Sequence, residues 1–446
     1  TMETDILPVD PLQLGHITTT QSENDLVEEW TIAYDPSSPA TQNLQRAAHE
    51  LLTTDVPVAF PTETVYGLGA DATRSSAVRA IFAAKGRPAD NPLIVHVHSL
   101  AQLRGLLRGS DSSTTSTAND NEDPIPAIYK PLIQKFWPGP LTLILPLPTP
   151  SPLAPEVTAT LSTFGARMPR SILALSLIRL AGVPLAAPSA NASTRPSPTA
   201  AEHVYDDLHG RISTILDGGP CEVGVESTVV DGLCDPPLIL RPGGITVEQL
   251  RTCEGWENVG VGYLDKEVEG KGVPRAPGMK YRHYSPKARV VLFEANAGLE
   301  SEEVVKRMQG CTCVGVIRTR SWPLALGLVD VEGKAVEQKL SEEPSPASMN
   351  GHASATTSNL QRSLLQHKIP HAEQFITKSE SGTDVTIWDI GLGVDTEDVA
   401  RGLFSALREL DKKGVEVILV EGVNDQDGDD IAAAVMNRLR KAAEVR

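Results

Sequence analysis

Two cations stand close together in the stretch FAAKGRPADNPLIVHV, residues 82–97. Lys85 and Arg87 are two residues apart in a turn rich in Gly, Pro and Asn, and an apolar run that ends at His96 follows. An irregular turn allows both side chains to converge on one anion, since Arg offers a planar fork for phosphate oxygens and Lys a point charge. The stretch therefore indicates either a phosphate site at the mouth of a sheet, with Asn91 adding an amide, or an ordinary surface turn.

Polar and basic side chains recur beside other apolar strands. They are Thr62 and Thr64 in PTETVYGLGADA, Thr163, Arg167 and Arg170 in TFGARMPRS, the Ser/Asn/Thr loop 188–199, Glu226 and Ser227 before STVVDG, and Arg241 in LRPG. Ligands of α/β sheets bind at the carboxyl ends of strands. One polar turn is ordinary, but five in succession are better explained by one shared anionic ligand.

The expected chemistry is the positioning of an anion and the stabilisation of its charge, without a covalent intermediate. The sequence contains no P-loop pattern, no nucleophile elbow and no paired-carboxylate motif. Its histidines and cysteines never cluster at metal-ligand spacing, so we expect no protein-bound metal.

Alternating helix and strand signals must position these side chains. Helical spacing or capping predicts helices at 41–55, 75–86 and 171–182, and short apolar runs between them predict strands. We divide the chain into an extended or partly ordered arm (1–40), an α/β domain (41–262), a linker rich in Gly, Pro and charge (263–288) and a second, parallel-sheet α/β domain (289–446). The polar segments 109–123 and 341–359 are expected to be disordered insertions.

Composition points to a globular protein of the cytoplasm. Of 446 residues, 40% are hydrophobic and 22% charged, and no apolar run approaches the length of a membrane span. The first basic residue is Arg46, so neither a secretory signal nor a mitochondrial presequence is visible. The five cysteines form no C-x-x-C pair, which is typical of reduced thiols.

The seven motifs PTETVYGLGADA, KGRPADNPLIVHV, FWPGPLTLIL, RMPRS, APSANASTRPSPT, ESTVVD and LRPG occur in this order. Together they closely resemble the YrdC-type family of threonylcarbamoyl-AMP synthases. The linker APGMKYRHYSPKA and the second domain resemble the long, two-domain form. The resemblance implies an open, twisted α/β sheet with a large concave cavity, plus a smaller Rossmann-like C-terminal α/β domain.

The resemblance also implies a reaction. Members of this family make L-threonylcarbamoyl-AMP and pyrophosphate from L-threonine, bicarbonate and ATP, which makes them nucleotidyltransferases. A downstream transferase then moves the threonylcarbamoyl group to tRNA. Magnesium is expected to be held by the phosphates and water, since the sequence offers no carboxylate cage.

Site residues follow from the matching motifs. Lys85, Arg87 and Asn91 would meet the phosphates, with Lys85 and Arg87 as the catalytic charge clamp. Thr64, His96, Arg167, Ser189 and Ser227 would hold threonine, with Arg167 on its carboxylate. Thr163, Asn191, Thr199 and Arg241 would hold the rest of the nucleotide, and Tyr284 would fold over the pocket as part of a lid.

The alternative from another class is a non-catalytic module that binds tRNA or other RNA. The net charge of −17 argues against it, because residues 1–50 carry nine acids and one base and the middle of the chain is near neutral. Tight RNA binding depends on neutralising many phosphates with basic side chains. We therefore do not expect stable tRNA binding.

Overall fold

The computed structural model describes most of the chain. The described residues are 2–21, 26–109, 122–263, 284–295, 301–328, 370–379, 382–425 and 430–443. Within these ranges no helix combines the length and the apolar character needed to cross a membrane. The expected insertion 109–123, apart from its ends, and the whole of 341–359 lie outside the described residues, as does most of the 263–288 linker.

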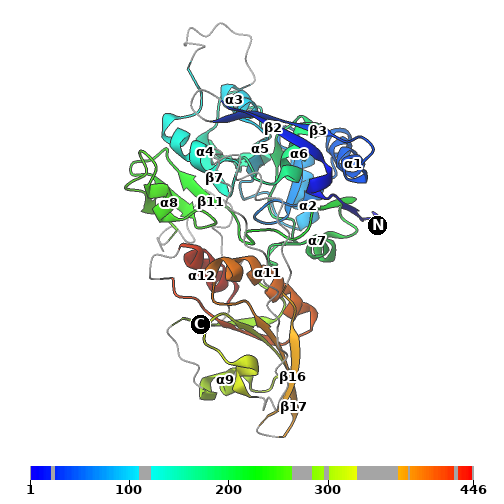
Figure 1. Cartoon of the computed structure of the whole chain (residues 1–446), viewed down its shortest axis with the longest axis vertical. Coiled ribbons are helices and arrows are strands. Elements are labelled where there is room, and N and C mark those ends of the chain that lie inside the picture. Colours follow the sequence, from blue (N-terminus) through cyan, green and yellow to red (C-terminus); the bar gives the residue numbers. More distant parts are fainter. Residues whose placement is uncertain are drawn as a thin grey trace, which may run out of the picture.

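An eleven-stranded mixed sheet forms the first domain (Figure 1). In spatial order its strands are β1 (Asp5–Pro8), β10 (Thr214–Asp217), β4 (Val58–Phe60), β5 (Gly67–Asp71), β9 (Leu185–Ala186), β6 (Ile94–His96), β8 (Thr163–Arg167), β7 (Leu141–Pro146), β11 (Thr228–Asp231), β12 (Leu238–Arg241) and β13 (Gly260–Val261). Antiparallel pairs such as β4–β5 and β7–β8 alternate with parallel ones such as β6–β8. The amino ends of some strands and the carboxyl ends of others therefore lie at the same edge of the sheet, where their loops can meet.

The described residues of the segment 1–40, which was expected to be an extended or partly ordered arm, form strands that pack on this domain. Strand β1 pairs in parallel with β10 at the edge of the sheet. Strands β2 (Gly15–Gln21) and β3 (Val27–Tyr34) form an antiparallel hairpin beside α3 (Leu100–Arg108). The Trp30 indole N–H donates to the His98 carbonyl at 2.7 Å, and this buried anchor holds the hairpin on the domain.

Helices cover the sheet. They are α1 (Pro39–Thr53), α2 (Ser75–Lys85), α3, α4 (Lys130–Phe136), α5 (Pro155–Thr158), α6 (Ile172–Ala181), α7 (Ala201–Leu208) and α8 (Val247–Arg251), with 3₁₀ turns at Pro11–Gln13 and Ala127–Tyr129. Among them, α1, α2 and α6 correspond to the predicted helices 41–55, 75–86 and 171–182. Gly86 ends α2 with a left-handed φ of 65°, which glycine adopts without strain. This cap sends the chain out of the helix between Lys85 and Arg87. Helix α1 packs on α6, with Leu44 and Leu51 buried and Leu52 exposed.

The second domain is a five-stranded sheet with helices around it. Its order is β14 (Arg289–Phe293), β18 (Val417–Glu421), β15 (Cys313–Arg318), β17 (Asp384–Gly391) and β16 (Glu373–Lys378), with α9 (Ser301–Met308), a 3₁₀ turn (Leu324–Gly327), α11 (Thr396–Lys412) and α12 (Asp430–Ala442). The first four strands are parallel, as expected from their apolar runs, and β16 is an antiparallel edge strand. The α/β class is confirmed for both domains.

Glu421 fills the position where a parallel sheet of this kind binds an anion. It stands at the carboxyl end of β18, and its carboxylate accepts backbone N–H groups from residues 319–322 at 2.5–3.2 Å. Consecutive amides of this type form an anion-binding nest. In the second domain the carboxylate of Glu421 therefore occupies the position that an external anion would take in this nest.

The two domains meet through α11 and α12, which lie between the sheets in Figure 1. Arg408 of α11 donates to Asp207 at 2.8 Å, and neither side chain is more than 3% exposed. A Cβ on Gly224 would lie 2.4 Å from the Arg401 Cα, so only glycine permits this approach of the two backbones. Val65 and Val225 of the first domain are part of the apolar core of the second. These contacts fix the second domain beside the loops of the first.

Candidate active site

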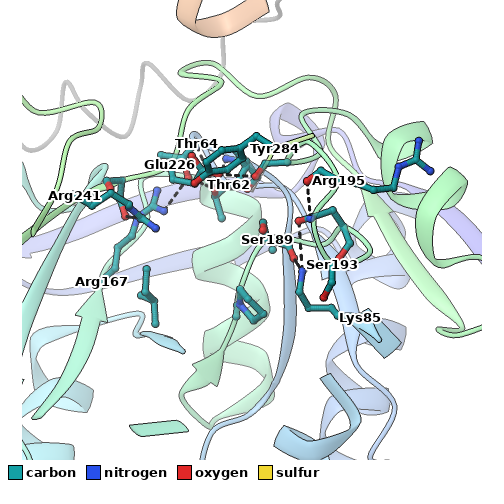
Figure 2. Close-up of a pocket in the computed structure, with 18 of the residues that line it drawn as sticks. Thr62, Thr64, Lys85, Arg167, Ser189, Ser193, Arg195, Glu226, Arg241 and Tyr284 are labelled. Atoms are coloured by element: carbon teal, nitrogen blue, oxygen red, sulfur yellow. Dashed lines mark hydrogen bonds between the residues drawn. The ribbon is translucent and has the colours of Figure 1, made fainter. Parts of the chain in front are cut away.

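One cavity of the first domain brings together ten of the thirteen predicted site residues (Figure 2). These are Thr64, Lys85, Arg87, His96, Arg167, Ser189, Asn191, Ser227, Arg241 and Tyr284. The cavity volume is about 90 Å³, which is below the range of roughly 300–1,000 Å³ that is usual for small-molecule sites. The described side chains thus leave room for only part of a nucleotide inside the cavity.

Lys85 lies at one end of the cavity, held by the loop that follows β9. Its Nζ donates to the carbonyl oxygens of Ser189 and Asn191, the latter at 2.7 Å. Burial, and then the charge of Arg87, lower the pKa of Lys85 well below its usual value. A nearby anion would reverse this shift, because an opposite charge favours the protonated amine.

Arg87 is a cation of the lining with hydrogen-bond donors that are not used by the described part of the protein. Its Nε and Nη2 are enclosed, yet they have no hydrogen-bond partner among the described residues. Its guanidinium lies over the Phe82 ring, 5.4 Å from the ring centre, in a cation–π contact. Buried donors without partners cost free energy, so this geometry favours an anionic ligand.

Arg167 stands at the carboxyl end of β8 and is fixed on three sides. Its Nη2 donates to Glu63 Oε1 at 2.5 Å, its Nη1 to Thr64 Oγ1 at 2.8 Å and its Nε to the Gly139 carbonyl at 3.2 Å. These contacts use three of the five N–H groups of the guanidinium. The remaining two can bind a carboxylate.

His96 is next to Arg167 across the β6–β8 pair. Burial and then the charge of Arg167 lower the pKa of His96 to about 3. The imidazole is therefore neutral at physiological pH. In this state it can give or accept a hydrogen bond but adds no charge to the cavity.

Arg241, Glu226 and Tyr284 gather at the Arg167 end of the cavity, opposite Lys85 (Figure 2). Arg241 Nη2 donates to Ser227 Oγ at 3.0 Å. Burial and then Glu226 raise the pKa of Tyr284 to about 12, so the phenol stays protonated. The Tyr284 ring stacks on Phe404 of α11 with 5.2 Å between ring centres.

Three predicted site residues do not line the cavity. Thr163 begins β8 whereas Arg167 ends it, so the strand separates the two. Thr199 is buried at the domain interface, where its Oγ1 lies 2.8 Å from Ser405 Oγ of α11. Asn91 is buried too, and its Oδ1 has no hydrogen-bond partner among the described residues.

Other residues complete the site without having been predicted as ligands. The cavity is also lined by Thr62, Ser193, Thr194, Arg195, Ser197 and Glu226. The polar composition of loop 188–199 signals most of them. Glu63, the partner of Arg167, could have been found as the carboxylate of PTETVYG, because a buried arginine usually pairs with an acid.

Two family models together match most of the chain. One, described as "Telomere recombination", matches residues 50–243, and the other, described as "Threonylcarbamoyl-AMP synthase, C-terminal domain", matches residues 245–444. A threonylcarbamoyl-AMP synthase of Schizosaccharomyces pombe is 43% identical over 459 aligned residues, which cover 100% of this chain and 98% of the relative. A threonylcarbamoyl-AMP synthase of Bacillus subtilis is 40% identical and covers 89% of this chain and 92% of its own.

A solved structure is similar over most of both domains. The structure of P. abyssi Sua5 complexed with L-threonine is 36% identical, has a TM-score of 0.65 and covers 90% of this chain and 94% of its own. The likeness in sequence and in structure thus extends over both domains. The chain belongs to the family of two-domain threonylcarbamoyl-AMP synthases.

Proposed function

We propose that the protein makes L-threonylcarbamoyl-AMP and pyrophosphate from L-threonine, bicarbonate and ATP. One observation carries the proposal. A single cavity has Lys85 at one end and Arg167, which has two N–H groups left over, at the other. Arg87 also lines the cavity and is close enough to Lys85 to lower its pKa. An amino-acid carboxylate and a polyphosphate need two such anion sites within reach of each other. The two relatives that align with 100% and 89% of this chain bear the name of this activity.

Threonine is proposed to bind at the Arg167 end. Its carboxylate takes the two N–H groups of Arg167 that the protein leaves available. Thr64, His96 and Ser227 surround this position, and the neutral imidazole of His96 avoids a second cation beside Arg167. Ser189 lies between this end and Lys85 in Figure 2, as expected for a residue beside the reacting centre.

The phosphates are proposed to bind at the other end. Arg87 offers Nε and Nη2, and the Lys85 ammonium can exchange carbonyl partners for phosphate oxygens. Asn191 would contact other parts of the nucleotide beside Lys85. Arg241 and Tyr284 would contact the nucleotide from the Arg167 end of the cavity. Thr163, Thr199 and Asn91 contribute no lining surface in this state.

The reaction then needs no protein nucleophile. The threonine amine combines with bicarbonate to give a carbamate, with loss of water. A carbamate oxygen attacks the α-phosphorus of ATP, and the bond from that phosphorus to the bridging β-oxygen breaks. Pyrophosphate leaves with the electron pair, so negative charge grows where Lys85 and Arg87 stand. The adenylyl group has been transferred, which defines a nucleotidyltransferase.

Magnesium is proposed to arrive with ATP as part of the substrate. Among the described residues no group of three or more His, Cys, Asp or Glu could hold a metal. The carboxylate of the lining, Glu226, already accepts hydrogen bonds from Ser197 and Arg438. The protein side chains therefore do not fit a resident ion, and phosphates and water suit this hard cation.

The product is an activated carbamoyl group and must pass to a downstream transferase that modifies tRNA. We also propose a cytoplasmic location, which is supported by free thiols at all five cysteines. Most of the segment expected to form a lid lies outside the described residues. Tyr284, the first described residue of this segment after the gap, is buried in the lining.

Pyrophosphate release with ATP and bicarbonate, with and without L-threonine, tests the function. Release that requires threonine is expected. Filter binding of tRNA at two salt concentrations tests the alternative. Tight, steeply salt-dependent tRNA binding without turnover would replace the proposal by an RNA-binding module.

A further inference from the structure

Glu226 is a buried carboxylate that connects three segments of the chain. Its Oε1 accepts the Ser197 hydroxyl at 2.5 Å, and the Tyr284 hydroxyl is a further partner. All three of these residues line the cavity. Their positions therefore depend on where the Glu226 carboxylate is held.

Arg438 holds that carboxylate from the second domain. It projects from α12, its side chain is 1% exposed, and its Nε donates to Glu226 Oε2 at 3.1 Å. Its Nη1 donates to the Pro242 carbonyl at 2.6 Å, beside Arg241. A planar guanidinium with two such contacts fixes both the carboxylate and the turn that follows β12.

The electrostatics of Glu226 agree with this geometry. Burial acts to raise its pKa, but Arg438 first and Arg241 second outweigh that effect, and the pKa is lowered. Glu226 is therefore ionised and acts only as an acceptor toward Ser197 and Tyr284. Arg241 lines the cavity, whereas Arg438 does not, so Arg438 can only act through its neighbours.

Resting on the proposed function, we propose that Arg438 is a positioning residue for synthesis. It fixes Glu226, which in turn orients Ser197 and Tyr284 around the substrates. The second domain thereby stabilises the active site, although none of the described residues that line the cavity belongs to that domain. This assignment gives the second domain a task in the reaction. It is consistent with that domain's own anion nest being filled by Glu421.

The matched test replaces Arg438, Lys412 and Arg440 one at a time by Met. Lys412 forms an interdomain ion pair with Asp206 at 2.6 Å, but neither residue lines the cavity. Arg440 lies on the same helix as Arg438 and pairs with Glu294 and Asp425 of its own domain. Lys412→Met thus shows the effect of losing an ion pair between the domains, and Arg440→Met shows the effect of losing a cation on α12. An effect seen only in Arg438→Met is due to the loss of the partner of Glu226.

In folded Arg438→Met protein we expect kcat/KM for pyrophosphate release to fall on the order of 10- to 100-fold, as for other losses of alignment away from the reacting atoms. Lys412→Met and Arg440→Met should stay near the unchanged protein. Arg438→Lys should recover part of the loss, since it restores the charge without the planar fork. Unchanged kcat and KM in folded Arg438→Met would overturn the proposal.

Hydrogen exchange supplies a readout that does not depend on activity. The Ser285 amide donates to the Thr194 carbonyl at 2.8 Å, and the Thr199 amide to His203 Nδ1 at 3.2 Å. Both amides should exchange faster in Arg438→Met than in either control. If the unchanged protein shows no threonine-dependent turnover, the proposed function fails, and equal exchange in all three variants would then refute the positioning role separately.

Discussion

Arg167 and Glu63 form an ion pair of 2.5 Å with side chains only 4% and 1% exposed. Glu63 Oε2 also accepts the backbone N–H of Arg170 at 3.1 Å. Glu63 therefore neutralises Arg167 and holds its guanidinium in one orientation at the end of β8. Removing one partner of such a buried pair leaves an uncompensated charge, which typically costs about 3–5 kcal/mol.

Arg167→Ala should abolish measurable threonine binding, because the carboxylate loses its fork. Glu63→Gln should keep Arg167 but release it from its fixed orientation, so threonine affinity should fall while some binding remains. Isothermal calorimetry with L-threonine measures both. Unchanged affinity in folded Arg167→Ala would remove this residue from the site.

Arg87→Ala should lower the rate of pyrophosphate release by roughly 10²-fold, since one lost charge contact to a phosphoryl transition state costs a few kcal/mol. The rate of pyrophosphate release by Arg87→Lys should lie between the rates of Arg87→Ala and of the unchanged protein. The melting temperature should hardly change, because Nε and Nη2 have no hydrogen-bond partner in the described part of the chain. Normal turnover in the folded Arg87→Ala variant would support the alternative that residues 82–97 form an ordinary surface turn and not a phosphate site.

ATP binding should take up a proton at Lys85. Burial lowers the pKa of the free amine, and a bound phosphate raises it again, so a proton is gained at any pH between the two pKa values. Calorimetry in two buffers with different ionisation enthalpies measures the uptake. Lys85→Arg is the control, because its charge does not titrate; equal proton uptake in both proteins would contradict the assignment.

His203 should make the fold less stable in mild acid. Burial, followed by Arg408 and Lys412, lowers its pKa to about 3, and its Nδ1 accepts the Thr199 amide. Between pH 6.5 and 3 the unfolded chain binds a proton that the folded chain does not, so stability falls as the pH drops through this window. From pH 6.5 to 5, wild type should lose roughly 1.5 kcal/mol more than His203→Gln. Chemical unfolding at both pH values measures the stability of wild type and of His203→Gln. Equal losses of stability in the two proteins would contradict a lowered pKa of His203.

Much of the fold could be predicted because local signals and tertiary structure agree. Helices α2 and α6 end at Gly86 and Gly182, and apolar runs mark most strands of both sheets. Strand β1 could not be found in this way. It has four residues, and its partner β10 lies about 200 residues further along the chain.

The site could be predicted where a motif places a charge at a strand end, as with Arg167. Nearness in sequence was misleading for Thr163, because four steps along a strand of about 3.3 Å each separate it from Arg167. The surroundings of Thr199 depend on the docking of α11, and no pattern near Thr199 reports on a contact 206 residues away. Contacts between the domains depend on the surfaces that form only when each domain has folded, and short sequence motifs do not predict those surfaces.

The pairing of Glu226 with Arg438 joins residues 212 positions apart. A ribosome makes the chain from the amino end at about 5–20 residues per second, so roughly 8–30 s pass between the synthesis of Tyr284 and that of Arg438. During this interval the nascent chain already contains every residue that lines the cavity, but it lacks the helix that fixes Glu226. The order of synthesis thus delays the assembly of a working site until the second domain has been translated and folded, and an unfinished chain has no means of consuming ATP efficiently.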